Sequence, residues 1–344
     1  MASGASLSSR EPRAAIFGCS GATLTPAERD FFRDADPLGF ILFQRNCDNP
    51  DQLRRLVAGL RDTVGRADAP VLIDQEGGRV ARLKPPHWPA YPAPAAIAAL
   101  GGAAAKEAAW LGARLIADDL AALGITVDCV PVLDIPVPGA DAVIGDRALG
   151  DEPAAVAALG RAVCDGMLAG GVLPVIKHIP GHGRATVDSH HALPRVAERR
   201  GTLAKSDFAP FKALADMPWA MTAHIVYDDI DAGAAATLSH KVVAQVIRGE
   251  IGFDGVLVSD DLSMRALGGG FADRAAGALA AGCDLVLHCN GDMTEMTAIA
   301  GATARLTPAA RERIDRAEVR RGAAQPIDRA TLAARFSALM ARAA

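Results

Sequence analysis

The sequence predicts a single (β/α)8 barrel (TIM barrel), an α/β fold, with a C-terminal helical extension. Eight short apolar runs recur along the 344 residues, helical patterns lie between them, and no break in composition divides the chain. This length suits either two average domains or one large barrel. We expect one domain over residues 1–344, with the barrel at about 12–305 and the helices at about 306–344. A doubly wound open sheet is the weaker alternative.

The eight apolar runs are the expected barrel strands. Most are nearly continuous in apolar residues, which is typical of parallel strands covered on both faces. They span residues 14–19, 39–43, 70–74, 125–132, 172–178, 219–225, 255–261 and 284–289.

The intervals between these runs carry apolar residues at helical spacing, so that one face of each helix can cover the sheet. Two such sets are Leu53, Leu56, Val57 and Leu60 after the second run, and Val156, Leu159, Val163 and Met167 after the fourth. The tail beyond Leu306 predicts one or two helices packed on the barrel exterior. We interpret the arginine cluster near Arg320 as a solvated helix face.

Composition argues against several partners. The formal net charge is −4 and no concentrated basic stripe precedes the last forty residues, so a nucleic acid is not expected. The longest weakly polar stretches are short and broken by Pro or Gly, so no membrane span is expected. The six cysteines form no CxxC pair, which favours free thiols. Residues 1–15 lack the apolar run of a signal peptide, and we expect a cytoplasmic monomer.

Polar residues collect where the predicted strands end, which in a barrel is where active sites lie. They are Asp74, Lys177, His178, His224, Asp260 and Asp261. The two long connections, which contain "AVIGDRALGDEP" and "GHGRATVDSHH", can reach over the same mouth. One pocket is therefore predicted to gather them.

The segment at 177–191 holds four of the eight histidines and permits three interpretations. A metal site is disfavoured, because Pro180 and two glycines around His182 prevent a helix that would align it with His178. A phosphate loop is disfavoured because "GHG" lacks the spacing of the glycine fingerprints. Asp188 and His190 can instead form a carboxylate–imidazole pair that shuttles protons, although an ordinary surface contact explains the local sequence equally well.

Asp260 and Asp261 lie at the end of one predicted strand, so their side chains point to opposite sides. One carboxylate can attack a substrate while the other caps or braces the loop. A strand-end carboxylate plus a proton shuttle suffices for double-displacement glycoside hydrolysis. Cations and carboxylates at the mouth would then bind sugar hydroxyls, with surface ion pairs as the alternative for the arginines; this set is Asp74, Arg82, Arg147 and Lys177.

Five strings, "DQEGGRVARL", "GDRALGDEP", "KHIPGHGRATVDSHHALP", "MTAHIVYDDID" and "VSDDLSM", occur in an order and spacing that resemble the family 3 glycoside hydrolases. The resemblance covers about residues 14–287 and is strongest to the bacterial β-N-acetylhexosaminidases of cell-wall recycling. It implies that Asp260 is the nucleophile and that His190, paired with Asp188, is the general acid/base. It also implies a subsite for a terminal N-acetylglucosamine, formed by Asp74, Arg82, Arg147, Lys177 and His178.

The resemblance thus implies a retaining enzyme without metal or cofactor that acts on N-acetylglucosaminyl-1,6-anhydro-N-acetylmuramic acid and its peptide-bearing forms. Three alternatives stay open. A phosphorylase would use phosphate as acceptor, a sensor would bind the sugar on an inactive barrel, and a metal-dependent barrel hydrolase would lose activity with a chelator.

Overall fold

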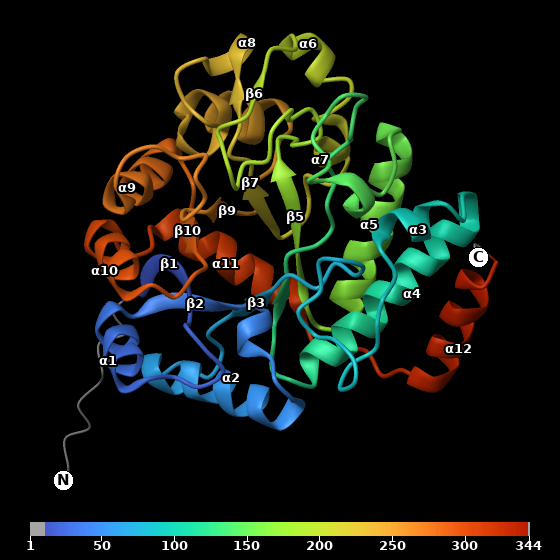
Figure 1. Cartoon of the computed structure of the whole chain (residues 1–344), viewed down its shortest axis with the longest axis horizontal. Coiled ribbons are helices and arrows are strands. Elements are labelled where there is room, and N and C mark those ends of the chain that lie inside the picture. The colour runs from blue at the N-terminus through green and yellow to red at the C-terminus, as the bar shows by residue number, and fades with distance from the viewer. Residues whose placement is uncertain (1–10, 343–344) are drawn as a thin grey trace.

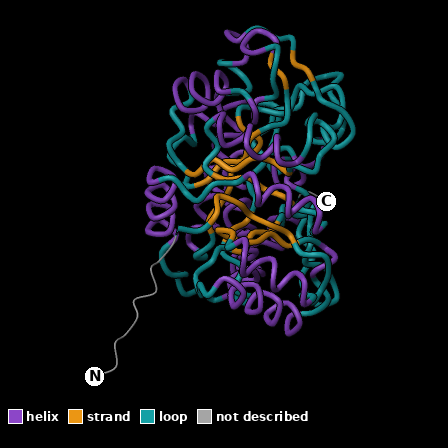
Figure 2. Tube along the Cα trace, turned by 90° about the vertical axis from the view of Figure 1, so that its left-hand side faces the viewer, coloured by secondary structure: helices purple, strands orange, loops and turns teal. Residues whose placement is uncertain are grey.

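A computed structural model describes residues 11–342 and contains a closed parallel barrel. The strand order around the barrel is β1-β10-β9-β7-β5-β4-β3-β2, closed by pairing of β2 with β1. Figure 1 shows the strands inside a ring of helices, and Figure 2 shows the same arrangement from the side. The barrel strands are β1 (Arg13–Gly18), β2 (Pro37–Leu42), β3 (Val71–Ile73), β4 (Val127–Asp128), β5 (Leu173–Ile179), β7 (Trp219–Thr222), β9 (Val256–Asp261) and β10 (Leu285–His288).

Each of the eight predicted runs overlaps one barrel strand, which confirms the predicted fold class. A further two-stranded sheet was not predicted. It pairs β6 (Arg195–Val196) with β8 (Val226–Tyr227) in the segments after β5 and β7. Two residues per strand give too short a pattern to be recognised against the surrounding loops.

The helices that surround the barrel are those that the apolar spacing indicated. Leu53, Leu56, Val57 and Leu60 are all buried on α2 (Pro50–Val64), and Asn49 caps the start of that helix. On α5 (Pro153–Ala169) the predicted residues are buried except Val163, which is partly buried. The other long helices are α1 (Pro26–Ala35), α4 (Gly102–Ala121), α9 (Phe271–Ala281) and α10 (Met293–Ala302).

Shorter helical segments fill the connections. They are α3 (Pro94–Ala98), α6 (Arg200–Leu203), α7 (Ala209–Ala213), α8 (Asp228–Asp231), single 3₁₀ turns at Gln44–Asn46, Gly145–Arg147 and Ala236–Leu238, and a π-helical segment at Val242–Glu250. The turn at Gly145–Arg147 lies in the long connection after β4, and its last residue faces the barrel mouth.

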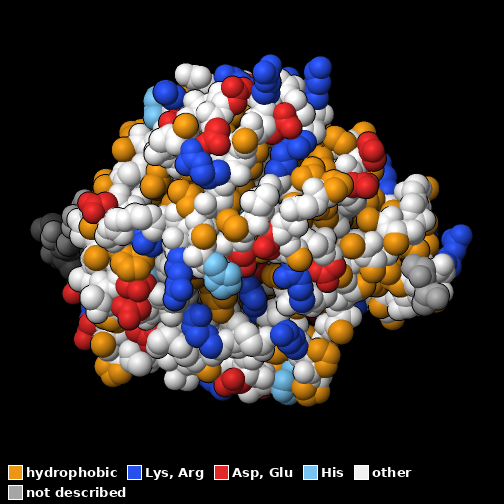
Figure 3. Space-filling model, turned by 45° about the horizontal axis from the view of Figure 1, so that its top comes forward, with side chains coloured by type: hydrophobic (Ala, Val, Ile, Leu, Met, Phe, Trp, Pro, Cys, Tyr) orange, Lys and Arg blue, Asp and Glu red, His pale blue; other side chains and the backbone are white. Residues whose placement is uncertain are grey.

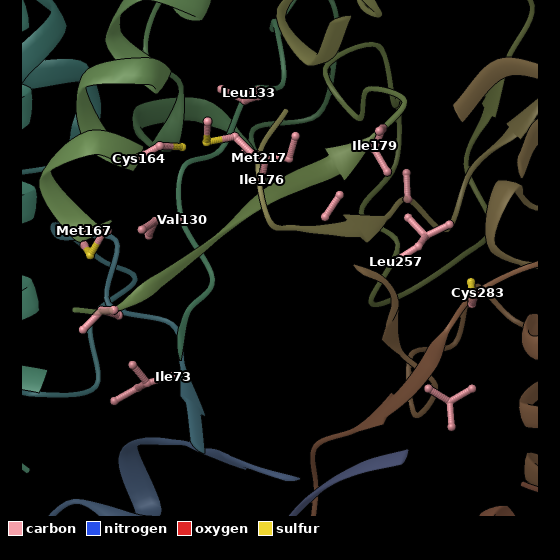
Figure 4. Packing of buried hydrophobic residues seen from close by; sticks show 14 of the residues in the cluster. Ile73, Val130, Leu133, Cys164, Met167, Ile176, Ile179, Met217, Leu257 and Cys283 are labelled. Atoms are coloured by element: carbon pink, nitrogen blue, oxygen red, sulfur yellow. The ribbon is translucent and has the colours of Figure 1, made fainter. Parts of the chain in front are cut away.

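Two apolar layers hold the barrel together. One fills its interior, and the other lies between the strands and the helices. Figure 4 shows part of the second layer, to which β5 contributes Ile176 and Ile179 and α5 contributes Cys164 and Met167. Alternate residues of a barrel strand face these two layers, so nearly every strand residue is buried.

The C-terminal tail forms α11 (Pro308–Arg321) and α12 (Arg329–Met340). Helix α12 packs on the barrel exterior as predicted, because its Phe336 lies in an apolar cluster with residues of α4. Helix α11 does not, because its Ala310, Ile314 and Ala317 join the cluster that fills the barrel interior. Helix α11 therefore closes the end of the barrel where the strands begin.

The arginine cluster on α11 is not simply a solvated face, which corrects the interpretation made from the sequence. Arg313 pairs with Asp254 and Asp284, at 3.1 and 2.9 Å, just before β9 and β10 begin. Arg320 pairs with Asp216, at 3.0 Å, just before β7. These ion pairs fasten α11 to the strand-start end of the barrel.

All six cysteines are buried free thiols, as the lack of paired spacing predicted. Within residues 11–342, no helix combines the length and the apolar composition needed to cross a bilayer. Most of the segment at 1–15, in which we expected no signal peptide, lies outside the described residues.

We predict that Ile314→Ala lowers the free energy of unfolding by about 2–5 kcal/mol, because Ile314 is buried against the barrel interior. Val319→Ala on the same helix is the matched control. Val319 is 84% exposed, so its truncation should change stability by no more than about 0.5 kcal/mol. Urea unfolding of both variants measures the difference, and equal effects would contradict the placement of α11.

Candidate active site

One cavity lies at the end of the barrel where the strands finish. Its volume is about 300 Å³, which lies in the usual range of small-molecule sites. Figure 3 shows the hollow on this face, with Lys and Arg side chains and a histidine around it. All eight residues predicted for the site line it: Asp74, Arg82, Arg147, Lys177, His178, Asp188, His190 and Asp260.

Five charged side chains form a continuous network along one wall. Asp74, directly after β3, contacts Lys177 Nζ through Oδ1 and Arg82 Nη2 through Oδ2, each at 2.9 Å. Glu76 Oε1 lies 2.7 Å from the same Lys177 Nζ. The Glu76 carboxylate also accepts two hydrogen bonds from Arg147, both at 2.8 Å. Positive and negative groups thus alternate from Arg82 to Arg147.

These charges persist at neutral pH although the network is buried. Burial raises the pKa of Asp74 and of Glu76, but the neighbouring cations outweigh it and hold both pKa values below their ordinary range. Burial lowers the pKa of Lys177, and the two carboxylates more than compensate, so that its pKa is raised. The wall therefore presents fixed cations and fixed carboxylates.

The turn after β3 explains how one short string supplies three of these side chains. Gly77 has φ +96°, and a Cβ there would lie 2.3 Å from the Pro92 carbonyl oxygen, so only glycine fits. Gln75 then holds the returning segment, since its Oε1 accepts hydrogen bonds from the backbone N–H of Arg82 at 2.8 Å and Leu83 at 3.0 Å. This turn brings Arg82 back beside Asp74.

A third buried carboxylate, that of Asp134, organises the histidine-rich segment. His178 Nδ1 donates to Asp134 Oδ2 at 2.7 Å, and the backbone N–H of His182 donates to Asp134 Oδ1 at 2.6 Å. Burial raises the pKa of Asp134, but His178 and His182 reverse this and lower it. The other ring nitrogen of His178 is left for contacts in the cavity. Burial lowers the pKa of His182 to about 4, so its ring is neutral at pH 7.

The two aspartates at the end of β9 have different partners. Asp260 has a single hydrogen bond within the described chain, from the Asp261 N–H to its own Oδ1 at 2.8 Å. Burial raises its pKa, and the imidazoles of His178 and His224 reverse the shift, so the pKa of Asp260 is lowered. The Asp261 carboxylate instead binds the Ser263 N–H and hydroxyl and the Cys289 N–H. Asp260 is thus an ionised carboxylate with oxygen atoms available to a ligand.

Asp188 and His190 form the predicted pair. His190 Nδ1 and its backbone N–H both donate to Asp188 Oδ1, at 2.7 and 2.9 Å. Burial raises the pKa of Asp188, but these two hydrogen bonds lower it below its ordinary value. The side chain of His190 is 61% exposed at the mouth of the cavity. Ser189 between them is buried and fastened, by its hydroxyl to His182 and by its carbonyl to the Ala266 N–H.

His224 was expected in the pocket, and the structure corrects this. Its side chain is fully buried behind the cavity wall and does not line it. Nε2 donates to the Asp261 carbonyl at 3.0 Å, so Nδ1 accepts from the Thr237 hydroxyl at 2.7 Å. His224 supports the backbone at the end of β9.

Sequence reasoning missed several residues that line or support the site. Glu76 and Asp134 carry the buried charge pairs, while Phe43 lies under the Arg82 guanidinium at 5.0 Å and also lines the cavity. The signals were present, because Glu76 belongs to "DQEGG" and Asp134 follows the fourth apolar run. Within residues 11–342, no three His, Cys, Asp or Glu side chains converge in a metal-binding group.

We predict that Glu76→Ala lowers the free energy of unfolding by about 3–5 kcal/mol, because it leaves the buried Arg147 guanidinium without its carboxylate. Asp146→Ala serves as control, since it removes a half-exposed partner of Arg79 and should cost only about 0–1 kcal/mol. Urea unfolding at neutral pH measures both. A cost for Glu76→Ala as small as that of the control would contradict the role given to this network.

We predict that the stability of the protein depends on pH through Asp128, at the end of β4. Burial raises its pKa to about 8, whereas the unfolded chain releases the proton near pH about 4. The retained proton therefore contributes stability in full below pH about 4, and this contribution is lost as the pH rises to about 8. Asp128→Asn cannot lose a proton and should become progressively more stable than the wild type across that window.

The difference in stability comes from one ionisable group. Relative to the wild type, the folded-to-unfolded ratio of the variant should therefore increase by up to about tenfold for each pH unit. Thermal unfolding from pH 4 to 8 measures it. Asp62→Asn, at an exposed position on α2, is the control and should show no such divergence. A constant difference between Asp128→Asn and wild type would refute the assignment.

Residues 26–321 match the family described as glycosyl hydrolase family 3 N terminal domain. A β-hexosaminidase of Alkalilimnicola ehrlichii is 39% identical over 286 residues, which cover 80% of each protein. A family 3 β-N-acetylglucosaminidase from Paenibacillus sp. superposes with a TM-score of 0.83 at 32% identity, over 95% of this chain and 67% of that one.

The NagZ of Neisseria gonorrhoeae, solved in complex with N-trifluoroacetyl-D-glucosamine, superposes with a TM-score of 0.85 at 30% identity. That superposition covers 97% of this chain and 99% of the other. The match to the family, at residues 26–321, therefore includes every barrel strand except β1, and with them every strand that contributes to the cavity. This chain belongs to glycoside hydrolase family 3 and is one of its NagZ-like β-hexosaminidases.

Proposed function

We propose that the protein is a retaining β-N-acetylglucosaminidase that removes non-reducing terminal N-acetylglucosamine from peptidoglycan fragments during cell-wall recycling. The observation that carries the retaining mechanism is the placement of two different devices on one cavity. An ionised carboxylate, Asp260, stands at the end of β9, and a proton-transfer pair, Asp188 and His190, reaches the same cavity from the segment after β5.

In the first step, His190 in its protonated form donates a proton to the oxygen of the leaving group. Asp260 attacks the anomeric carbon from the opposite side of the sugar, the glycosidic bond breaks, and a glycosyl–Asp260 ester forms. The lowered pKa of Asp260 keeps its carboxylate ionised for this attack. Asp188 occupies Nδ1 of His190, so Nε2 is the nitrogen that exchanges the proton.

In the second step, His190 takes a proton from water as that water attacks the anomeric carbon. The ester bond to Asp260 breaks, the carboxylate is regenerated, and His190 is again protonated. Two inversions give net retention of configuration. Each proton that leaves His190 in the first step returns in the second, so the cycle consumes only water and the glycoside.

The charged wall would bind the terminal sugar. Carboxylates accept strong hydrogen bonds from hydroxyl groups, and cations donate strong hydrogen bonds to them. Both kinds of group alternate along this wall, and their ion pairs fix their side chains. We assign this role to Asp74, Arg82, Arg147, Lys177 and His178. The network holds the four charged groups in place before substrate arrives, and Asp134 holds His178, which reduces the ordering cost of binding.

The similar proteins support the identity of the sugar. The Neisseria gonorrhoeae structure contains N-trifluoroacetyl-D-glucosamine, and the Paenibacillus protein is a β-N-acetylglucosaminidase. We extend this to N-acetylglucosaminyl-1,6-anhydro-N-acetylmuramic acid and its peptides on the basis of the five motif strings. Six buried free thiols are compatible with action in the reducing cytoplasm.

A phosphorylase is the second candidate, and one observation favours it. The acid/base at the cavity mouth is an imidazole, which is neutral after giving up its proton and repels phosphate less than a carboxylate would. Phosphate could then replace water in the second step and yield the sugar 1-phosphate.

The deciding experiment measures nitrophenol released from p-nitrophenyl N-acetyl-β-glucosaminide, with and without phosphate and chelator. We expect hydrolysis in water that resists the chelator, is lost to the assay limit in Asp260→Ala, and falls about 10²–10⁴-fold in His190→Ala. Asp62→Ala, at an exposed position on α2, should keep full activity. The anomer first released, followed by NMR, should be β.

Each outcome decides between the candidates. Activity that requires phosphate would favour the phosphorylase, and loss with chelator would favour a metal-dependent hydrolase. No activity on any N-acetylglucosaminide would leave a sugar-binding barrel. Release of N-acetylglucosamine from the anhydro-muropeptide, measured by mass spectrometry, tests the natural substrate.

A further inference from the structure

His288 is a fully buried histidine that the proposed mechanism does not use. It ends β10, and neither ring nitrogen has a hydrogen-bond partner within the described chain. The rings of Phe17, from β1, and Phe271, from α9, make edge contacts with it, and their centroids lie 6.5 and 5.8 Å from the centroid of the imidazole. Buried polar groups are rarely left unpartnered, so this imidazole calls for a physical account.

A carboxylate faces each end of the ring. Asp261 Oδ1 lies 4.0 Å from Nδ1, and Glu295 Oε2, from α10, lies 3.4 Å from Nε2. Glu295 is itself held by the Asn290 amide at 2.6 Å and by its backbone N–H to Asp292 at 3.0 Å. Asn290 and Asp292, between β10 and α10, also lie close enough to raise the pKa of His288. The Arg274 guanidinium lies 4.9 Å from the Phe271 ring.

The two carboxylates and the burial act against each other on His288. Burial lowers its pKa, and Asp261 and Glu295 partly offset this. Its ring is therefore neutral at neutral pH and becomes charged on acidification. A charged ring would draw Asp261 Oδ1 across the 4.0 Å gap to form a charge-assisted hydrogen bond.

Asp261 cannot move without consequence, because three of its groups hold the site. Its Oδ1 accepts from the Ser263 and Cys289 N–H groups, its carbonyl accepts from His224, and its own N–H donates to Asp260. The loop that begins at Ser263 then reaches the acid/base segment, where the Ala266 N–H donates to the Ser189 carbonyl at 3.1 Å. Ser189 stands between Asp188 and His190.

We propose that His288 is a positioning residue: only while its imidazole is neutral does Asp261 keep the contacts that hold the Asp260 carboxylate and the Asp188–His190 pair in register. Protonation of His288 pulls Asp261 away from the loop and slows the chemical step. The effect falls on kcat rather than on KM, because the charged wall that binds the sugar has no contact with His288.

The test compares pH profiles of kcat for p-nitrophenyl N-acetyl-β-glucosaminide and so rests on the proposed function. His288→Gln cannot acquire the charge, so its acid limb should move to lower pH by at least about 0.5 unit, with KM changed less than about twofold. Glu295→Gln removes one of the groups that favour the imidazolium, and it should move the limb in the same direction. Glu312→Gln, at an exposed position on α11, is the matched control and should leave the limb unchanged.

Glu295 is partly exposed, so its variant tests the proposal even if His288→Gln does not fold. An acid limb that stays in place in the folded variants would overturn the proposal, as would a change in KM alone. NMR gives a readout independent of activity: the His288 ring and the backbone amides of Asp261, Ser263 and Ala266 should titrate together in the wild type.

Separate titrations of the ring and these amides would also overturn the proposal. A wild type that shows concerted titration but no glycosidase activity would refute the proposed function while leaving the positioning of Asp261 by His288 established.

Discussion

The ammonium of Lys177 lies 2.9 Å from Asp74 Oδ1 and 2.7 Å from Glu76 Oε1, and its side chain is 2% exposed. An amine with so little water around it stays charged only if carboxylates are fixed against it, and these carboxylates in turn need further cations. Arg82 and Arg147 supply them from two different loops. The pairing of β5 with its neighbours, the turn after β3 and the connection after β4 are thereby tied together at one point.

The proposed active site divides into parts of different rigidity because of this network. The sugar-binding wall is buried, and three of its charges, Asp74, Glu76 and Lys177, each contact two opposite charges. A change there is therefore felt as a change in folding. His190 lies on the segment after β5, and next to it Ser189 makes one hydrogen bond to His182 and one to Ala266. The side chain of His190 is itself 61% exposed, so a change at this residue alters proton transfer without unpairing a buried charge.

The fold and the site residues differ in how far the sequence reveals them. Eight strands were predicted because a parallel barrel strand is a continuous apolar run, and Asp74, Lys177 and Asp260 were found because they stand where such runs end. Glu76 and Asp134 were missed because a buried carboxylate is recognised by its partner, and Arg147 and His178 are 71 and 44 residues distant. The ion pair between Arg313 of α11 and Asp284 was also missed, because the two residues are 29 positions apart in the sequence.

Buried histidines at three strand ends show how position decides the chemistry of one residue type. His178 is held by a buried carboxylate at 2.7 Å and faces the cavity, whereas His224 is held by a carbonyl and a hydroxyl and supports the backbone beside Asp260. His288 has two carboxylates in reach and a hydrogen bond to neither. Both nitrogens of the His224 ring are bonded and burial lowers its pKa, so it resists a change of charge, while a ring held between unbonded carboxylates gains two partners on protonation. The third histidine is therefore the one at which acid can alter the geometry around Asp260.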